Sequence, residues 1–370
     1  MADHSTRGEE TAEHRRRTGR GSGVRSWRHG PLYATVWVTV GALVLAGAGL
    51  GLVYLRVDGN ISGIDIDSAL GTDRPVDVPD GSLDILVLGS DTRSGDNARY
   101  GRDDGTARSD TAMIVHINEA HDRASVVSIP RDTLVERPEC KKGEGGTAPA
   151  EPRAMFNEAY ETGGPVCAVK TVEALTGIRM DHYVEVDFSG FRKLVDALGG
   201  VEITTTRPIR DEDSRLRLSA GHHTLTGEQA LALVRTRKTV GNGSDLGRIR
   251  LQHAFLRKFV DQVRGVGAFS EPGKFYDLVD TATTALTTDS ELASVADLAG
   301  LAKTLKDVES RNIQMVTLPV RYSSSDPNRV VPMEKRTERI WKALRADEPI
   351  PDSAARDSAA KEDDTGVVAE

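Results

Sequence analysis

Three short apolar runs between residues 82 and 133 constrain the fold of this chain most strongly. They are residues 85–88, 113–117 and 125–129, and each is rich in β-branched side chains. Runs of this composition that are too short for a helix predict buried strands. We therefore expect the chain to be built around a sheet that contains these three strands.

Charged residues stand at one end of each run. They are Asp91 and Arg93 after the first run, Arg108 and Asp110 before the second, and Arg131 and Asp132 after the third. If the strands lie side by side, two carboxylates and at least three guanidiniums meet at one edge of the sheet. Guanidiniums bind phosphate through planar sets of donors, and paired carboxylates hold a hard divalent cation that bridges phosphate oxygens. The pattern predicts a site for a metal-bound phosphate or pyrophosphate; the alternative is a set of ordinary ion pairs on a solvated rim.

A second group of polar residues lies where two predicted amphipathic helices meet, within residues 225–263. Its members are Arg235, Arg237, Asp245, Arg248 and Gln252. The first two stand at the end of one helix, and the last two are four residues apart on one face of the next. A helix N-terminus beside several arginines favours anion binding. A solvated basic helix end is the alternative.

An uncharged apolar segment, residues 32–55, is long enough to cross about 30 Å of hydrocarbon as a single helix. The arginines that precede it predict a cytoplasmic N-terminus, so the rest of the chain lies outside the cell membrane. A cleaved signal peptide is the alternative, but its apolar core is usually only about 7 to 15 residues long. We expect a retained single-pass transmembrane helix.

The predicted domains follow from this segment. They are a disordered cytoplasmic tail (1–31), the transmembrane helix (32–55), an extracellular linker (56–81), a folded domain (82–345) and a disordered acidic tail (346–370). The predicted fold class of the domain is α/β, with a mixed central sheet flanked by helices on both sides.

The charge distribution argues against nucleic-acid binding. Residues 1–30 hold seven arginines and four acids, a charge of +3, so the remainder of a chain whose net charge is -8 carries -8 - 3 = -11. Nucleic-acid binding needs a broad basic face, which an acidic exterior part does not offer.

The two cysteines, Cys140 and Cys167, both fall in the predicted exterior part. Oxidising conditions there permit a disulfide, which would stabilise the fold by about 3 to 4 kcal/mol by closing a flexible loop. Two unpaired thiols are the alternative. His182 is predicted to be structural, because no second His or Cys stands at ligand spacing from it.

The sequence resembles the LytR-CpsA-Psr family of bacterial envelope proteins, and its Ala-, Arg-, Gly- and Asp-rich composition favours an actinobacterial source. The resemblance covers roughly residues 82–264, in nine blocks that occur in one order. These blocks are LGSDTR, RSDT, SIPRDT, NEAY with GGP, TVEALTGI, DHYVEVDF, LVDALGGVEI, LTGEQALALVRTRK and SDLGRIRLQ. Leu251 and Met155 depart from the family pattern, since many relatives carry a basic residue at each position.

The resemblance implies a membrane-anchored enzyme that transfers a glycopolymer, such as a teichoic acid, from a polyprenyl-pyrophosphate carrier to peptidoglycan. It implies Mg²⁺ at the pyrophosphate, with Mn²⁺ as the alternative ion, and catalytic roles for Asp91, Asp110 and Arg131. Asp91 and Asp110 would hold the metal. The pyrophosphate would be bound by Arg93, Arg108, Arg131, Arg235, Arg237, Arg248 and Gln252, and Asp245 would orient the arginines. Asp132 is a candidate general base, with an ion pair to an arginine as the alternative.

Two other functions remain open from the sequence. A polyprenyl-pyrophosphate pyrophosphatase would use the same site, with water in place of the sugar hydroxyl. A non-catalytic envelope regulator that binds polyprenyl phosphates would use the site without turnover. The polymer that is transferred and the oligomeric state are not predicted.

Overall fold

The computed structural model describes residues 58–59, 61–76, 81–91, 109–142, 145–236, 245–266, 272–355 and 368. All of them belong to one of two compact units, Val53–Glu370. Among the described residues, no helix is long and apolar enough to cross a membrane. The predicted transmembrane segment, 32–55, and three predicted site residues, Arg93, Arg108 and Arg237, lie outside the described residues.

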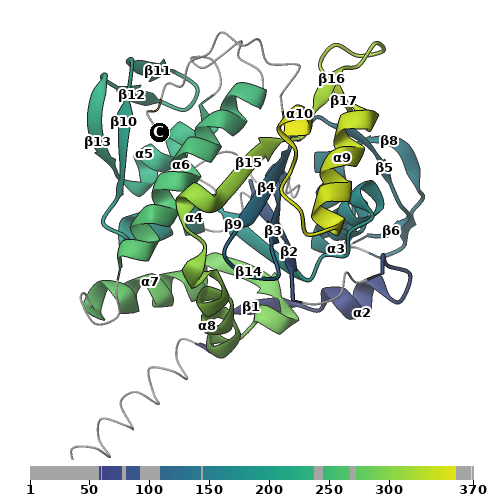
Figure 1. The fold of residues 1–370 in the computed structure, drawn as a ribbon, viewed down its shortest axis with the longest axis horizontal. Coiled ribbons are helices and arrows are strands. Elements are labelled where there is room, and N and C mark those ends of the chain that lie inside the picture. The colour runs from purple at the N-terminus through teal and green to yellow at the C-terminus, as the bar shows by residue number, and fades with distance from the viewer. Residues whose placement is uncertain are drawn as a thin grey trace, which may run out of the picture. The chain divides into compact units, whose positions relative to one another are not determined.

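A seven-stranded mixed sheet forms the centre of the domain (Figure 1). Its strands, in spatial order, are β1 (Ser62–Ile64), β14 (Leu286–Asp289), β9 (His182–Asp187), β2 (Leu83–Ser90), β3 (Ser109–Ile117), β4 (Ala124–Ile129) and β15 (Ile313–Thr317). The three predicted strands are confirmed as β2, β3 and β4, and the mixed sheet of the predicted fold class is confirmed too.

The pairing directions bring strand ends with predicted chemistry to one end of the sheet. Strand β3 pairs antiparallel with both β2 and β4, so it starts where its two neighbours finish. Strand β9 is parallel to β2, and β15 is parallel to β4, so these strands also finish at that end. The predicted convergence of the three strand ends is therefore confirmed.

Helices cover both faces of the sheet, as predicted (Figure 1). On one face, α3 (Phe156–Thr176) and α9 (Glu334–Arg345) pack on side chains that are fully buried, such as Leu86, Leu88 and Ile114. On the other face, α6 (Asp245–Gly265) and α8 (Val295–Thr304) contribute apolar side chains to a separate cluster.

The face beneath α6 and α8 is covered less completely than the face beneath α3 and α9. Val87, Val115, Val184 and Met315 sit in four different strands on this face, yet each remains partly exposed. Buried protein interiors are normally packed to crystal-like density. Partial exposure of aliphatic side chains so far inside a sheet therefore indicates space between the sheet and its helices.

A further apolar cluster lies beside the sheet and supports the two helices whose junction carries predicted site residues. It is formed by α4 (Phe188–Ala197), α5 (Gly227–Arg235), the first half of α6 and two hairpins. The hairpins are β10 (Val201–Thr205) with β13 (Gly221–Leu225), and β11 (Ile209–Asp211) with β12 (Leu216–Leu218). Thr226 caps α5 and exchanges hydrogen bonds with Gln229, so this helix starts where the sequence predicts.

Three pairs of short strands and a further helix lie around this framework. They are β5 (Leu134–Arg137) with β8 (Glu151–Met155), β6 (Cys140–Lys141) with β7 (Thr147–Ala148), β16 (Val320–Tyr322) with β17 (Val330–Pro332), and α7 (Pro272–Ala285). Three 3₁₀ turns, Ser290–Leu292, Leu305–Asp307 and Ser310–Asn312, link the elements of the last third of the chain.

The predicted boundaries of the folded domain are too narrow at both ends. Residues assigned to the linker form β1 and α2 (Ile66–Leu70), and Ile66 and Leu70 belong to the main core. Residues assigned to the acidic tail continue into α10 (Asp352–Ala355), and Ile350 and Ala354 are buried in the same core. Each segment contributes only a few isolated apolar residues in polar surroundings, so no local pattern reveals its burial.

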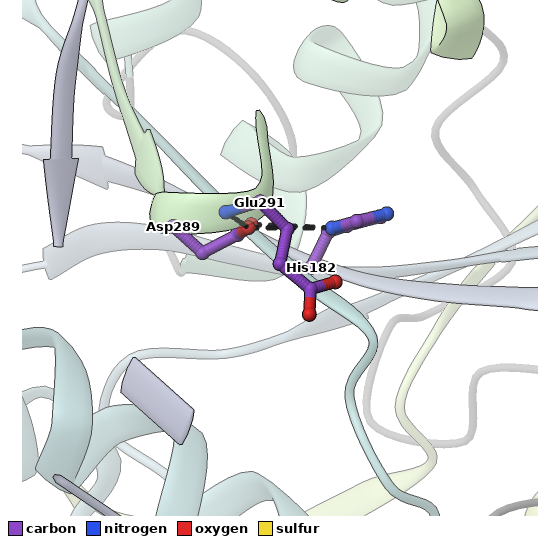
Figure 2. Close-up of side chains that lie close together, drawn as sticks. All are labelled: His182, Asp289 and Glu291. Atoms are coloured by element: carbon purple, nitrogen blue, oxygen red, sulfur yellow. Dashed lines mark hydrogen bonds and ion pairs between the residues drawn. The ribbon is translucent and has the colours of Figure 1, made fainter. Parts of the chain in front are cut away.

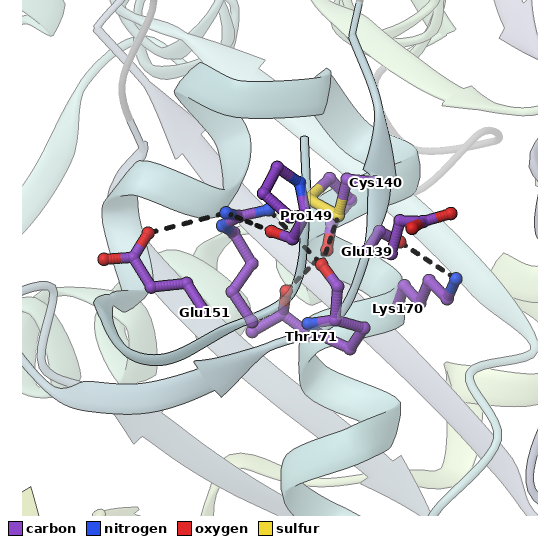
Figure 3. The surroundings of a disulfide bond; sticks show 9 residues. Glu139, Cys140, Pro149, Glu151, Lys170 and Thr171 are labelled. Carbon is purple, nitrogen blue, oxygen red and sulfur yellow. Dashed lines mark hydrogen bonds and ion pairs between the residues drawn. A yellow bond between two sulfur atoms is a disulfide. The ribbon is translucent and has the colours of Figure 1, made fainter. Parts of the chain in front are cut away.

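The predicted disulfide is confirmed between Cys140 and Cys167, whose Cα atoms lie 5.5 Å apart (Figure 3). It joins the β6 loop to α3 just after a break in that helix, at Gly163 and Gly164. A Cβ atom on Gly163 would lie 2.5 Å from the carbonyl oxygen of Lys141. Glycine is therefore required where the loop crosses the helix.

Candidate functional site

An ion pair between Asp110 and Arg131 stands at the end of the sheet where β2 and β4 finish. The Nη1 of Arg131 lies 2.6 Å from the Oδ1 of Asp110, and both side chains are about one quarter exposed, at 25% and 21%. Asp91 directly follows Ser90, the last residue of β2, which pairs with Ser109 beside Asp110. The two predicted metal-binding carboxylates thus come from adjacent strand ends.

Asp132 lies between two arginines. Its Oδ2 is 3.6 Å from the Nε of Arg131, and its Oδ1 is 3.7 Å from the Nη1 of Arg329. Each of its carboxylate oxygens therefore faces a guanidinium. The ion-pair alternative stated for Asp132 matches this geometry better than the role of general base.

The first half of α6 is fastened to the start of β3. The Nη2 of Arg248 donates to the carbonyl oxygen of Asp110 at 2.6 Å, and the Nε2 of Gln252 donates to the Oγ1 of Thr111 at 3.0 Å. Both α6 side chains are almost fully buried, with exposed fractions of 3% and 8%. Two predicted phosphate-binding residues therefore meet the Asp110 strand end. For Asp245, the first residue of α6, only the backbone is described.

Arg235, at the end of α5, is held by an aromatic ring. Its guanidinium carbon lies 4.5 Å from the centre of the Phe188 ring. Phe188 directly follows β9, which finishes at the same end of the sheet as β2. The cation–π contact therefore keeps this arginine beside the strand ends.

The sequence reasoning missed several polar residues that support the site. The backbone N–H of Asn157, at the start of α3, donates to the carbonyl oxygen of Arg131 at 3.2 Å. The hydroxyl of Tyr160 donates to Glu185 at 2.7 Å, and the hydroxyl of Tyr183 donates to the same carboxylate. Asn157 and Tyr160 stand in the NEAY block, so the sequence contained a signal for these two residues. The contact of Tyr160 with Glu185 could not be predicted, because Glu185 lies in a separate strand, β9.

Burial and a neighbouring carboxylate raise the pKa of both tyrosines in this network. Burial raises the pKa of Tyr160, and the neighbouring Glu185 carboxylate raises it further. The pKa of Tyr183 is raised well above its ordinary value for the same two reasons. Both hydroxyls therefore stay protonated at neutral pH and act as hydrogen-bond donors to Glu185 beneath the site.

The oxygen donors near the strand ends suit a magnesium ion. Two carboxylates, Asp91 and Asp110, stand at these strand ends. Two neighbouring residues add buried amide oxygens, Oδ1 of Asn157 and Oε1 of Gln252, which have no hydrogen-bond partner among the described residues. Hard divalent cations and their water ligands take oxygen donors of this kind. The residues present therefore fit the ion that the family resemblance implies.

One other group of potential metal ligands lies elsewhere on the sheet, at the start of β9. His182, Asp289 and Glu291 offer ligand atoms within 4.8 Å of one another (Figure 2). The Asp289 carboxylate, however, already accepts the backbone N–H groups of Tyr183 and Leu292, at 2.8 and 3.1 Å, and pairs with His182 at 3.3 Å. The group fastens β9 to the turn after β14, in keeping with the structural role predicted for His182.

Comparison with known proteins places the chain in a family. A family model described as the LytR_cpsA_psr family matches residues 53–346. Cell wall biosynthesis protein LcpA of Corynebacterium glutamicum is 31% identical over 320 residues, which cover 78% of this chain and 60% of LcpA. The polyisoprenyl-teichoic acid–peptidoglycan teichoic acid transferase TagT of Bacillus subtilis is 33% identical over 235 residues, 62% of this chain and 66% of TagT. The chain thus spans less than two thirds of the length of either relative.

Solved structures share the fold. The structure of TagT bound to LI-WTA superimposes with a TM-score of 0.55 and 26% identity, covering 75% of this chain and 94% of that one. The family match extends over most of the described domain and includes every described residue of the Asp110 site. The chain therefore belongs to the LytR_cpsA_psr family.

Proposed function

We propose that this protein transfers an anionic glycopolymer from a polyprenyl-pyrophosphate carrier to peptidoglycan and forms a phosphodiester link. One observation carries the proposal. Along α6, Arg248, Gln252, Leu256 and Val260 recur at intervals of four, so they share one helical face. The first two contact the Asp110 strand end, and the last two pack on the incompletely covered face of the sheet.

This face of α6 matches the chemistry of a lipid pyrophosphate. Its polar turns provide anion-binding donors, and its apolar turns continue for about 18 Å from Arg248 along the sheet at 1.5 Å per residue. The partly exposed side chains of Val87, Val115 and Val184 line the sheet opposite them. A ligand with a charged head and a long apolar chain satisfies both ends of this surface, whereas a free nucleotide or sugar phosphate would satisfy only one.

His253 supports a low-polarity environment on this face. Its Nε2 lies 2.8 Å from the Oγ of Ser128 on β4, and burial lowers the pKa of its imidazole to about 4, with a smaller effect from the charge of Arg257. The ring therefore remains neutral at physiological pH. A neutral histidine is compatible with a neighbouring apolar chain, because it adds no charge that must be desolvated.

Asp91 and Asp110 would hold Mg²⁺, or Mn²⁺ as the alternative. When bound, the ion would neutralise charge on the pyrophosphate oxygens. Arg131 would donate its planar set of N–H groups to the same phosphate, and Arg248 and Arg235 would add positive charge from α6 and α5. Arg93, Arg108 and Arg237 are assigned to the pyrophosphate by the resemblance, and Asp245 to orienting the arginines.

In the proposed reaction, a hydroxyl of a peptidoglycan sugar attacks the phosphorus nearest the donor sugar. A new P–O bond forms to that hydroxyl oxygen, the bridging P–O bond breaks, and polyprenyl phosphate leaves with the bond's electron pair. The hydroxyl proton passes to solvent or to the leaving phosphate. Positioning and charge stabilisation dominate phosphoryl transfer, so the protein needs no strong general base. Asp132, held between two arginines, would position them.

We also propose that residues 32–55 anchor the chain in the cell membrane, with the N-terminus in the cytoplasm and the domain outside. The donor's polyprenyl chain lies in the same membrane, so anchoring confines the enzyme to its substrate. A reporter fused to the C-terminus is expected to be active only if the reporter works outside the membrane. A fusion active only in the cytoplasm would contradict this topology.

The deciding experiment is transfer of a radiolabelled glycan from a synthetic polyprenyl-pyrophosphate donor to peptidoglycan oligomers by the full chain. We expect metal-dependent attachment that Asp110→Ala and Arg131→Ala abolish, while Arg311→Ala on the surface leaves it intact. Hydrolysis of the donor without attachment would favour a pyrophosphatase. Tight donor binding with neither reaction would favour a non-catalytic regulator that binds polyprenyl phosphates.

A further inference from the structure

A cavity of about 700 Å³ lies among β5, β8, β16, β17 and α9. Ligand-binding cavities for small molecules typically measure about 300 to 1,000 Å³. The cavity shares none of its lining residues with the Asp110 site. It therefore provides room for a ligand that the site described above does not account for.

Two buried polar groups in the wall of the cavity lack partners. The Oγ1 of Thr337 and the Nε1 of Trp341 have no hydrogen-bond partner among the described residues, although their side chains are only 5% and 2% exposed. Both residues stand on α9 and line the cavity. Unsatisfied buried polar groups are costly, and they commonly mark a place where a ligand or water supplies the missing bond.

The charges around the cavity are mixed and favour neither a polyanion nor a cation. The lining carries two arginines and three glutamates, together with three hydroxyl side chains and an apolar floor that includes Leu134 and Val331. A polyanion would be repelled by the glutamates, and a cation by the arginines. A neutral ligand rich in hydroxyls and amides uses donors and acceptors of both kinds, and its apolar faces can rest on an aliphatic floor.

Two short chain segments lead from the cavity lining to the proposed reaction centre. Leu134 follows Arg131 by three residues, across a turn closed by a hydrogen bond from the N–H of Thr133 to the carbonyl oxygen of Pro130 at 3.0 Å. Next to the lining residue Val331, the N–H of Val330 donates to the carbonyl oxygen of Asp132 at 3.2 Å, and Arg329 pairs with the Asp132 carboxylate. A chain molecule seated in the cavity could therefore extend along β5 and β17 to the phosphate held by Arg131.

From these observations we infer that the cavity binds the acceptor, as a subsite for the acetamido sugars of a peptidoglycan glycan strand. This inference rests on the proposed transferase function, which supplies a glycan acceptor. The acetamido carbonyl would accept the orphan N–H of Trp341, and sugar hydroxyls would bond to Thr337 and to the charged rim that includes Arg321. Both atoms are buried, so these contacts require the two side chains to rotate towards the cavity when the glycan binds.

The sequence offers a specific optical probe of this cavity. The chain has three tryptophans, Trp27, Trp37 and Trp341, and of these the structure describes Trp341, which lies in the wall of the cavity. A Trp27→Phe/Trp37→Phe background therefore reports on Trp341 alone. Titration of this full chain with a peptidoglycan tetrasaccharide that carries no stem peptide is expected to change its emission in a saturable manner.

Two substitutions test whether the emission change comes from the inferred contacts. Thr337→Val removes a hydroxyl that has no partner, so the thermal midpoint should not fall, while the dissociation constant for the tetrasaccharide should rise about tenfold, the effect of one lost hydrogen bond. Arg321→Ala should weaken binding similarly. Arg311→Ala, an exposed arginine outside the cavity, is the matched control and should bind as the unsubstituted protein does. Affinity for the donor should be unchanged in all three.

The outcomes separate the inference from the function on which it rests. Equal tetrasaccharide affinity in all variants, or binding only of the free stem peptide, would overturn the acceptor subsite. Transfer to peptidoglycan by a protein that shows no tetrasaccharide binding at millimolar concentration would overturn it too and leave the transferase function standing. Saturable binding that Thr337→Val weakens, in a protein without transfer activity, would support a glycan site and contradict the transferase.

Discussion

The Nη1 of Arg131 lies 2.6 Å from the Oδ1 of Asp110, across the gap between the end of β4 and the start of β3. Each residue therefore holds the other at the strand end, even though their sequence positions are 21 residues apart. Arg248 contacts the backbone of the same aspartate from α6. One aspartate thus links three elements, through its carboxylate to the end of β4 and through its backbone carbonyl to α6, and a change in any of them should alter phosphate binding.

At position 131, the planar set of N–H donors should matter more for the transfer rate than the positive charge alone. We expect Arg131→Ala to lower the initial transfer rate by at least about 10²-fold, as for the loss of one transition-state donor in other enzymes. Arg131→Lys keeps the charge but loses the planar set of donors, so its rate should also fall well below that of the unsubstituted protein. The rate of glycan attachment measures both, with Arg311→Ala as control. A fully active lysine variant would mean that this position supplies charge alone.

Removal of divalent cations should stop transfer. After treatment with a chelator, activity is expected to return with Mg²⁺ and, as the alternative ion, with Mn²⁺. Asp91→Asn and Asp110→Asn should each raise the cation concentration needed for half-maximal rate, because a neutral amide is a weaker ligand than a carboxylate. Full activity of the chelated protein would contradict the metal assignment.

The strand ends illustrate what could be predicted from sequence. Short β-branched runs with charged ends predict both the strands and the end of the sheet where Asp91, Asp110 and Arg131 gather, because an antiparallel strand starts where its neighbours finish. The partners of these residues could not be found in the same way. Asp132 pairs with Arg329, and Tyr160 with Glu185, through contacts that depend on tertiary packing rather than on any local period.

The predicted domain boundaries were too narrow for a related reason. Arg74 donates to Glu173 at 3.0 Å and to the carbonyl oxygen of Met180 at 2.7 Å, so a segment that is polar in sequence is fastened into the core. At the other end, Gln314 and Ile350 exchange backbone and side-chain hydrogen bonds. Composition predicts a linker and a tail in such segments, because it does not reveal which individual residues are buried and hydrogen-bonded to the core.

Two histidines should give the stability of the domain opposite pH dependences. His116 is 3% exposed, and its ring nitrogens lie 3.0 Å from Asp84 and 3.0 Å from Asp347. Burial alone lowers the pKa of His116, but its hydrogen bonds and charge interactions with the two carboxylates outweigh burial and raise it. The stabilisation is therefore complete below the ordinary pKa of about 6.5 and is lost as the pH rises through the raised pKa.

His116→Gln should accordingly destabilise the domain most in acid. Loss of this buried network should cost about 1 to 3 kcal/mol of unfolding free energy below pH 6, and the difference from the unsubstituted protein should shrink at alkaline pH. Denaturant unfolding between pH 5 and 9 measures it. A difference that stays constant across this range would show that the charge of His116 adds nothing to stability.

His253 provides the comparison of opposite sign. Burial lowers its pKa to about 4, so the folded state resists a proton that the unfolded state takes up below about pH 6.5. The domain therefore loses stability through this residue as the pH falls from about 6.5 towards 4. His253→Gln should remove this loss, so in denaturant unfolding the stability of the variant should rise relative to the unsubstituted protein as the pH falls from about 6.5 towards 4. A relative rise in stability at alkaline pH only would contradict the assignment.

The disulfide should act on stability rather than on the reaction. Cys140 and Cys167 are separated by 27 residues, and a loop of this length predicts a loss of about 3 to 4 kcal/mol when both are replaced by alanine. Reducing agent should lower the thermal midpoint of the unsubstituted protein and leave that of the double variant unchanged. If the folded double variant also lost donor binding, the disulfide would have a role in the site as well.

The space beneath α6 is tested by two matched substitutions on adjacent strands. Val115 on β3 is partly exposed beneath α6, whereas Val127 on β4 is fully buried on the opposite face. Val115→Phe should fill existing space at little cost in stability, while Val127→Phe should overpack a dense core and cost about 1 to 3 kcal/mol. In transfer assays, Val115→Phe is expected to raise the KM for a long-chain polyprenyl donor and to leave the KM for a donor with a short, two-isoprene chain unchanged. An equal effect on both donors would show that the phenylalanine disturbs the phosphate site, and an effect on neither would show that the apolar chain lies elsewhere.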